Sequence, residues 1–348
     1  MITPPQSGHM TPVRINSVVT HWEGDVTFYN QTPDDAIGTV WLIWHENVPP
    51  GGLQSFFAKR CFQELWLRRV ALVILPLSSI GFGVASDGKV ILSRDGNIVK
   101  EPPSIIWMHP SLKNIPPHFR QHLKALGCHV FNDMNNTIRR DIWLDNLSIS
   151  SVLEKGHVRI PQTHLIQSKG DVTFALQSLS LPFVVKYNAM NAHMGSQGQG
   201  VIKIDSRSQF LDLAPLLLER PGFFVAQEYI DMHDVRIYCT DSTYDWSLSR
   251  TPGKDQWKCN YALGGTLTYT QREDIDDSLL EASLAIVRVL GLDYVAFDWG
   301  IHKRTGIPYL IEINRLGVFT RLNEESQERN LGAVLAQQMA KIIMTRNE

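Results

Sequence analysis

The amino-acid sequence predicts an α/β protein built from two or three lobes. Short apolar runs of the kind that form buried strands alternate with longer stretches of helical periodicity, which is typical of a mostly parallel sheet covered by helices. The chain has 348 residues, which is too many for one small domain, and 43% of them are hydrophobic. It can therefore bury substantial cores.

Composition excludes several classes of protein. A formal net charge of -2 gives no bulk attraction to nucleic acid. The four cysteines show neither zinc spacing nor a disulfide framework. The N-terminus lacks the apolar core of a signal peptide, and the longest apolar run, "VALVILPL", is too short to span a bilayer. We expect a cytoplasmic protein without nucleic-acid or membrane partners, and homo-oligomer formation stays open.

The first half of the chain carries the α/β alternation. Residues 1–36 are polar and rich in turns, with one alternating stretch at 17–30 that is consistent with a hairpin, and we treat them as an N-terminal appendage. The α/β domain is expected over 37–135. Its elements are strands at 40–44, 70–77, 104–110 and 129–133 and helices at 54–69 and 116–126.

The second half divides into a central region, 136–228, and a C-terminal region, 229–348. The central region is expected to contain helices at 136–156, 171–179 and 207–220 and strands at 163–167, 181–186, 201–204 and 223–230. The C-terminal region is expected to contain a strand at 234–241, a helix at 276–291, a strand pair over 293–314 and a closing helix at 331–344.

A glycine-rich stretch, "NAHMGSQGQGV", follows the apolar run that ends at Lys186. Glycines at 195, 198 and 200 allow backbone N–H groups to approach phosphate oxygens, and Lys186 supplies a point charge beside them. The stretch is not a P-loop, because GxxxxGK[ST] is absent. Taken alone it is equally consistent with a hairpin that binds nothing.

Three oxygen-bearing side chains recur in "AFDWGIHKRTGIPYLIEIN". Asp298 is expected to end one strand, and Glu312 and Asn314 share one face of the next strand at period two. Two adjacent strands bring the three together, and such ligands suit Mg²⁺ or Mn²⁺ beside nucleotide phosphates. The alternative is that they are solvated residues at strand ends, which the apolar setting disfavours.

Two further stretches suit a nucleotide. Gln227, Glu228, Tyr229 and Ile230 end an apolar strand, where their backbone groups can meet an adenine edge. Asp234 then follows at a position suited to ribose hydroxyls. In "SLSRTPGKDQWKCNYALGG", Arg250, Lys258 and Asn260 alternate with loop residues before the glycine pair.

The order of these motifs resembles the ATP-grasp amide ligases, and within them the ribosomal-protein glutamate ligase branch. "FVVK", "GSQGQGV", "QEYI", "DVRIY", "WKCN", "FDWG" and "IEIN" follow one another over about residues 180–316. The resemblance implies a three-lobed ATP-grasp fold, with a central lid domain and a C-terminal metal-binding domain. It implies an enzyme that joins a carboxylate to an amine through an acylphosphate, using ATP and Mg²⁺ or Mn²⁺.

The resemblance also implies roles for single residues. Lys186 is similar to the lysine that contacts nucleotide phosphates, and Arg236 and Arg250 are similar to the cations that face the transferred phosphate. Lys258 and Asn260 are similar to residues that lie beside these cations. The mobile lid corresponds to Gly195, Ser196, Gln197, Gly198 and Gly200. The nucleotide-binding hinge corresponds to Gln227, Glu228, Tyr229 and Ile230, the ribose acid to Asp234, and the metal ligands to Asp298, Glu312 and Asn314.

Two departures from the family pattern bear on function. Ile142 stands where the family has a lysine, and Arg315 follows Asn314 where the family has a small residue. We expect Arg315, with Arg321, to bind a carboxylate of a small-molecule or peptide substrate, unless Arg315 only pairs with a nearby acid. Two alternatives stay open: a kinase of a small alcohol, similar to inositol-phosphate kinases, and a nucleotide-binding regulator without catalysis.

Overall fold

The computed structural model describes residues 32–44, 61–108, 117–133, 159–189, 200–220, 222–240, 243–259, 263–314 and 331–348. The chain forms two compact units. Of the described residues, unit 1 contains those up to Asp133, the segment Gly291–Asp293 and residues 331–348, and unit 2 contains the rest. The expected borders after 135 and 228 stay predictions. Within the described ranges no helix is long and apolar enough to cross a membrane.

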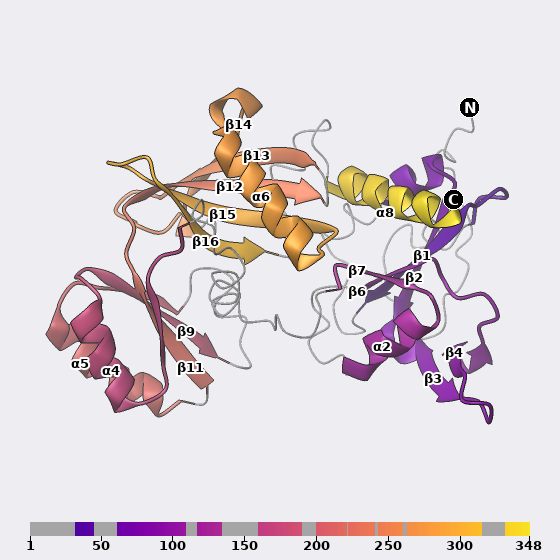
Figure 1. Ribbon diagram of the computed structural model, residues 1–348, viewed down its shortest axis with the longest axis horizontal. Helices are drawn as coiled ribbons and strands as arrows, with labels where there is room; N and C mark the ends of the chain where they lie inside the picture. Colours follow the sequence, from indigo (N-terminus) through magenta and orange to yellow (C-terminus); the bar gives the residue numbers. More distant parts are fainter. Residues whose placement is uncertain are drawn as a thin grey trace. The chain divides into compact units, whose positions relative to one another are not determined.

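Unit 1 is built on a parallel four-stranded sheet with the order β2-β1-β6-β7 (Figure 1). Its strands are β1 (Gly38–Trp44), β2 (Val70–Pro76), β6 (Ile105–Met108) and β7 (His129–Phe131). The sequence of β2 is apolar throughout, and its residues from Val70 to Leu75 are buried, as expected for a strand covered on both faces. The α/β layer expected for this part of the chain is confirmed.

Helices and a small extra sheet cover this parallel sheet. Residues 61–67 are helical, and α2 (Pro117–Ala125) inserts Phe119 and Leu123 into the core beside Ile106. The extra sheet consists of β3 (Ile80–Val84), β4 (Val90–Arg94) and β5 (Asn97–Ile98), which follow the 3-10 turn η2 (Leu77–Ser79). Phe82 of β3 meets Phe119 edge-on at 4.7 Å between ring centroids. The sequence pattern predicts no element here, because glycines interrupt the alternation in "IGFGV".

The closing helix α8 (Leu331–Asn347) is hydrogen-bonded to residues that precede two of the parallel strands. The guanidinium group of Arg346 donates to the carbonyl oxygen of Ser104 at 3.2 Å, and it also donates to that of Gly127. These two residues come just before β6 and β7. The helix therefore completes unit 1 from the far end of the chain.

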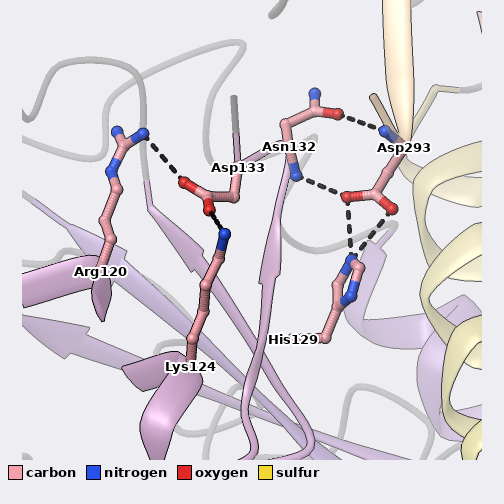
Figure 2. Close-up of polar contacts among 6 residues, drawn as sticks. All are labelled: Arg120, Lys124, His129, Asn132, Asp133 and Asp293. Carbon is pink, nitrogen blue, oxygen red and sulfur yellow. Dashed lines mark hydrogen bonds and ion pairs between the residues drawn. The ribbon is translucent and has the colours of Figure 1, made fainter. Parts of the chain in front are cut away.

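The turn Gly291–Asp293 is held in unit 1 by its aspartate (Figure 2). Nε2 of His129 lies 3.0 Å from both carboxylate oxygens of Asp293, and the backbone N–H of Asn132 donates to Oδ2 at 2.6 Å. In return the N–H of Asp293 donates to Oδ1 of Asn132 at 2.9 Å. The neighbouring carboxylate of Asp133 is paired with Arg120 and Lys124. We call His129, Asn132 and Asp293 the β7 clamp.

The first sheet of unit 2 is antiparallel, with the order β10-β9-β11-β8. Its strands are β8 (Thr163–Ile166), β9 (Phe183–Ala189), β10 (Val201–Ile204) and β11 (Gly222–Glu228). Helices α4 (Lys169–Ser178) and α5 (Arg207–Leu218) lie together against it (Figure 1), and Phe183, Phe210 and Phe224 pack at their interface. Ser168 caps α4 in a capping box with Asp171.

The second sheet of unit 2 is also antiparallel, with the order β14-β13-β12-β15-β16. Its strands are β12 (Met232–Thr240), β13 (Tyr244–Thr251), β14 (Thr266–Thr270), β15 (Tyr294–His302) and β16 (Pro308–Asn314). The 3-10 turn η5 (Arg272–Asp274) leads to α6 (Asp277–Leu290), where Ser283 accepts a hydrogen bond from Nε1 of Trp299 at 3.0 Å.

Two details of the strands differ from the sequence-based expectation. Asp298 does not end its strand, because β15 keeps pairing with β12 as far as His302. Lys186 does not end its strand either, since β9 continues to Ala189. Helix 136–156 and the hairpin at 17–30 lie outside the described residues.

The β7 clamp generates a stability prediction. Asp293→Ala removes the acceptor of the partly buried contacts to His129 and Asn132, so we expect a loss of roughly 1–3 kcal/mol in the free energy of unfolding. Thermal melting of the full chain measures it. The control is Asp35→Ala, whose ion pair with Arg69 is exposed and contributes about 1 kcal/mol or less. Equal melting temperatures for the two variants would contradict a stabilising clamp.

Candidate functional site

The register of the second sheet brings acids and cations to one face. Arg236 of β12 stands directly opposite Asp298 of β15, which stands opposite Glu312 of β16. One row away, Asp234 of β12 stands opposite Arg250 of β13. Directly opposed residues of antiparallel strands project from the same face. The sheet therefore brings together five residues that the sequence singles out.

Asp298 is the centre of this charged face. Nε and Nη2 of Arg236 donate to its two carboxylate oxygens at 2.6 and 2.7 Å, in a two-point contact. Nη2 of Arg250 lies 3.0 Å from Oδ2, and Nδ2 of Asn314 donates to Oδ2 at 3.1 Å. Burial alone would raise the pKa of Asp298, but Arg236 and then Arg250 outweigh it and hold the pKa below its ordinary value. The carboxylate is therefore ionised.

Asp234 is held by Arg250. Nε and Nη2 of Arg250 lie 2.8 and 2.7 Å from Oδ1 of Asp234, which is 7% exposed. Burial raises the pKa of Asp234, although the guanidinium of Arg250 opposes the shift. A contact between Asp234 and ribose hydroxyls stays a prediction.

Lys186 and Glu312 complete the charged face from two sheets. Lys186, on β9, is buried, and burial lowers its pKa to about 8 against the attraction of Glu312 and Asp298. Burial, followed by repulsion from Asp298, raises the pKa of Glu312 to about 7. The pKa values of both groups are therefore shifted toward neutral pH, which is common where residues meet a reacting or bound charge.

The hairpin expected after Lys186 is confirmed. β9 and β10 are antiparallel, and Lys186 pairs with Val201. Gly200 begins the return strand with φ of +77°, a conformation that favours glycine, and its carbonyl accepts from the N–H of Tyr187 at 2.9 Å. The other predicted lid residues, Gly195, Ser196, Gln197 and Gly198, lie outside the described residues.

The predicted adenine hinge lies where β11 ends. The side chain of Gln227 is buried and donates to Oγ1 of Thr163 at 2.8 Å. The N–H of Glu228 already donates to the carbonyl of Gln162 at 2.8 Å. Ile230 is buried. An adenine edge would therefore meet the backbone of Tyr229 or Ile230 more readily than that of Glu228.

The sequence motifs missed the groups around Tyr229. Its ring meets Trp257 at 5.9 Å between centroids, and Nζ of Lys203 lies 4.5 Å above it. The signal for Lys203 is the alternation in "VIKI", where it is the one polar side chain. The predicted phosphate contact Lys258 lies over Trp257, and burial lowers its pKa.

Cys259 was also missed. Burial raises the pKa of its thiol to about 11, followed by repulsion from Asp234. The predicted site residues Asn260, Arg315 and Arg321 lie outside the described residues, and so does Ile142, which stands where the family has a lysine.

The donor set fits a hard divalent cation. Asp298, Glu312 and Asn314 offer only carboxylate and amide oxygens, the chemistry that Mg²⁺ and Mn²⁺ prefer. Across the described ranges no three His, Cys, Asp or Glu side chains form a metal-binding group. A metal here would therefore need oxygens from the amide and from nucleotide phosphates as well.

A known protein family matches the part of the chain that carries the charged face. Residues 144–343 match the model of the RimK-like ATP-grasp domain. A search of the curated proteins found no match.

Solved structures share the fold at low identity. The RiPP-associated ATP-grasp ligase of Chryseobacterium gregarium, solved with ADP and a leader and core peptide, is 14% identical, with 89% of this chain and 97% of that chain covered and a TM-score of 0.60. The D-alanine–D-alanine ligase of Bacillus anthracis, solved with ATP, is 14% identical, with 88% and 96% covered and a TM-score of 0.55. The macrocyclase MdnC of Microcystis aeruginosa, bound to its precursor peptide, is 14% identical, with 88% and 99% covered and a TM-score of 0.57.

These likenesses confirm the expected ATP-grasp fold. The family model covers more than half of the chain, and its range contains every motif from "FVVK" to "IEIN". The chain therefore belongs to the RimK-like ATP-grasp family and is an enzyme of the ATP-grasp ligase type.

Proposed function

We propose that this enzyme joins a carboxylate to an amine through an acylphosphate, with ATP as the phosphoryl donor. The observation that carries the proposal is the charged face of Asp298, Arg236, Arg250, Glu312 and Lys186. Buried cations and acids of this kind can hold a triphosphate and its metal while little water is present. The type of reaction, ATP-dependent formation of a carbon–nitrogen bond, is proposed from membership of the RimK-like ATP-grasp family.

The chemistry proceeds in two steps. A substrate carboxylate oxygen forms a bond to the γ-phosphorus of ATP, and the bond from that phosphorus to the bridging oxygen breaks, which releases ADP. The amine nitrogen then attacks the acyl carbon, loses a proton and expels phosphate. The product is an amide. No general base is assigned, because the amine can arrive neutral.

Each residue of the charged face has a proposed part. Arg250 and Arg236 stabilise the negative charge that spreads over the transferring phosphoryl group, and Lys186 binds a phosphate oxygen. Asp298, Glu312 and Asn314 would hold Mg²⁺ or Mn²⁺, which neutralises phosphate charge when bound. The β9–β10 hairpin would exclude water from the acylphosphate.

The substrates are proposed as a small-molecule or peptide carboxylate and a small-molecule or peptide amine. Two of the similar structures are described as bound to peptides, and a third is a ligase of two D-alanines. Arg315 and Arg321 are proposed to bind a substrate carboxylate. A cytoplasmic location is part of the proposal, since all four cysteines are free thiols.

Product analysis tests the reaction type. We expect one pair from a panel of amino acids, dipeptides and short acidic peptides to release ADP and phosphate and to give a product lighter than the pair by one water. A product heavier by one phosphate group would identify a kinase instead. Nucleotide binding with neither product for any pair would favour a regulator. Mass spectrometry with ADP assay distinguishes the three outcomes.

Glu312→Gln tests the metal role and the charge of the site together. The raised pKa means that ionised Glu312 destabilises the folded state: its stabilising contribution is present below the ordinary value of 4.5 and is lost as pH rises to about 7. We therefore expect the variant to melt close to the wild type at pH 5 and above it at pH 8. Turnover should fall on the order of a hundredfold.

The matched control for this variant is Glu281→Gln, since Glu281 is exposed on α6. It should leave both the melting temperature and the turnover close to wild type at either pH. Wild-type turnover in Glu312→Gln would remove the metal assignment, and a lower melting temperature at pH 8 would contradict the charge argument.

A further inference from the structure

The carboxylate of Asp298 is already engaged by donors from three strands. Arg236 contributes two N–H groups, one to each oxygen, and Arg250 and Asn314 each contribute one group to Oδ2. A carboxylate has about four lone-pair directions, two on each oxygen. Oδ2 receives three of these contacts, and Oδ1 receives one, from Nε of Arg236. A metal ion that binds Oδ2 must displace a donor, and one that binds Oδ1 lies beside the guanidinium group of Arg236.

Among the described residues, this face carries equal numbers of acidic and basic side chains. Its acids are Asp234, Asp298 and Glu312, and its cations are Lys186, Arg236 and Arg250. Asp298 is 4% exposed and Lys186 is 6% exposed, so solvent screens the charges weakly. A divalent cation that enters alone would meet two guanidinium groups. A nucleoside triphosphate brings the negative charge that offsets both guanidinium groups.

We infer that Arg236 keeps metal ions away from Asp298 until a nucleotide is bound. Arg236 is thus a positioning residue that makes metal binding depend on ATP, in addition to its proposed contact with the transferring phosphate. The inference rests on the proposed function, because it takes Asp298 as a metal ligand.

We assign this role to Arg236 rather than to Arg250 because the two guanidinium groups differ in the partners that remain to them when they leave Asp298. Arg250 makes two contacts with Asp234 and a single longer contact with Asp298, so it can leave Asp298 and keep a buried partner. Arg236 places Nε and Nη2 on Asp298, and its other buried partner, the phenol of Tyr238, is not a carboxylate. Release of Arg236 is therefore the larger change, and phosphate oxygens are suitable new acceptors for it.

Manganese binding to the full chain tests the inference without an activity assay. The electron paramagnetic resonance signal of unbound Mn²⁺ is measured during titration of nucleotide-free protein. We expect weak binding by the wild type and roughly tenfold or tighter binding by Arg236→Gln, because a buried like charge has been removed. Arg236→Lys keeps the charge without the fork and should lie between them. Arg68→Gln, which breaks an ion pair with Glu64 elsewhere, should match the wild type.

The double variant Arg236→Gln with Glu312→Gln should lose the gained affinity, which ties the gain to this site. Thermal melting checks that each variant is folded, and Arg236→Lys carries the test if Arg236→Gln does not fold. Wild-type affinity in both Arg236 variants, or tight Mn²⁺ binding by nucleotide-free wild type, would overturn the inference.

A separate titration with the ATP analogue AMPPNP distinguishes this failure from failure of the proposed function. If AMPPNP binds the wild type only when Mn²⁺ is present, the nucleotide and metal site stands, and any failure above belongs to Arg236 alone. If AMPPNP does not bind, or binds equally well in EDTA, the proposed nucleotide and metal site is wrong, and the failure belongs to the proposed function.

Discussion

The carboxylate of Asp298, held between two guanidinium groups inside a β-sheet, is the interaction on which the site depends. A buried carboxylate is costly unless it is paired and hydrogen-bonded. Arg236 meets this requirement with a two-point contact, and Arg250 links Asp298 to Asp234. Because Asp298 pairs with both Arg236 and Arg250, its removal would leave two largely buried cations without their common partner.

The fold supplies this arrangement through strand register. Antiparallel pairing of β12, β13, β15 and β16 sets each charged residue opposite its partner, so a shift by one residue would turn the partners to opposite faces. Trp299 follows Asp298 and projects to the other side, where its indole donates to Ser283 of α6. The helix thus anchors the strand directly behind the charged face. Lys186 arrives from a different sheet in the same unit.

Much of this could be predicted from the sequence, because periodicity and motif order are local properties. The apolar runs on either side of the glycine-rich stretch predicted the β9–β10 hairpin, and period two predicted that Glu312 and Asn314 share one face and meet Asp298 across the strand pair. Partners outside that strand pair could not be predicted in the same way, since they depend on register. The pairing of Arg250 with Asp234 and the β7 clamp, which joins residues 161 positions apart, are of this kind. The small sheet over 80–98 was missed because its glycines hide the alternation.

A crystal structure with AMPPNP and Mn²⁺ tests the central claim most directly, because the anomalous signal of manganese locates the metal independently of the phosphates. The account predicts Mn²⁺ bound to oxygens of Asp298, Glu312 and Asn314, with phosphate oxygens completing its coordination. It also predicts that Arg236 no longer makes its two-point contact with Asp298. Manganese and phosphates away from this face, with both guanidinium groups still on Asp298, would contradict it.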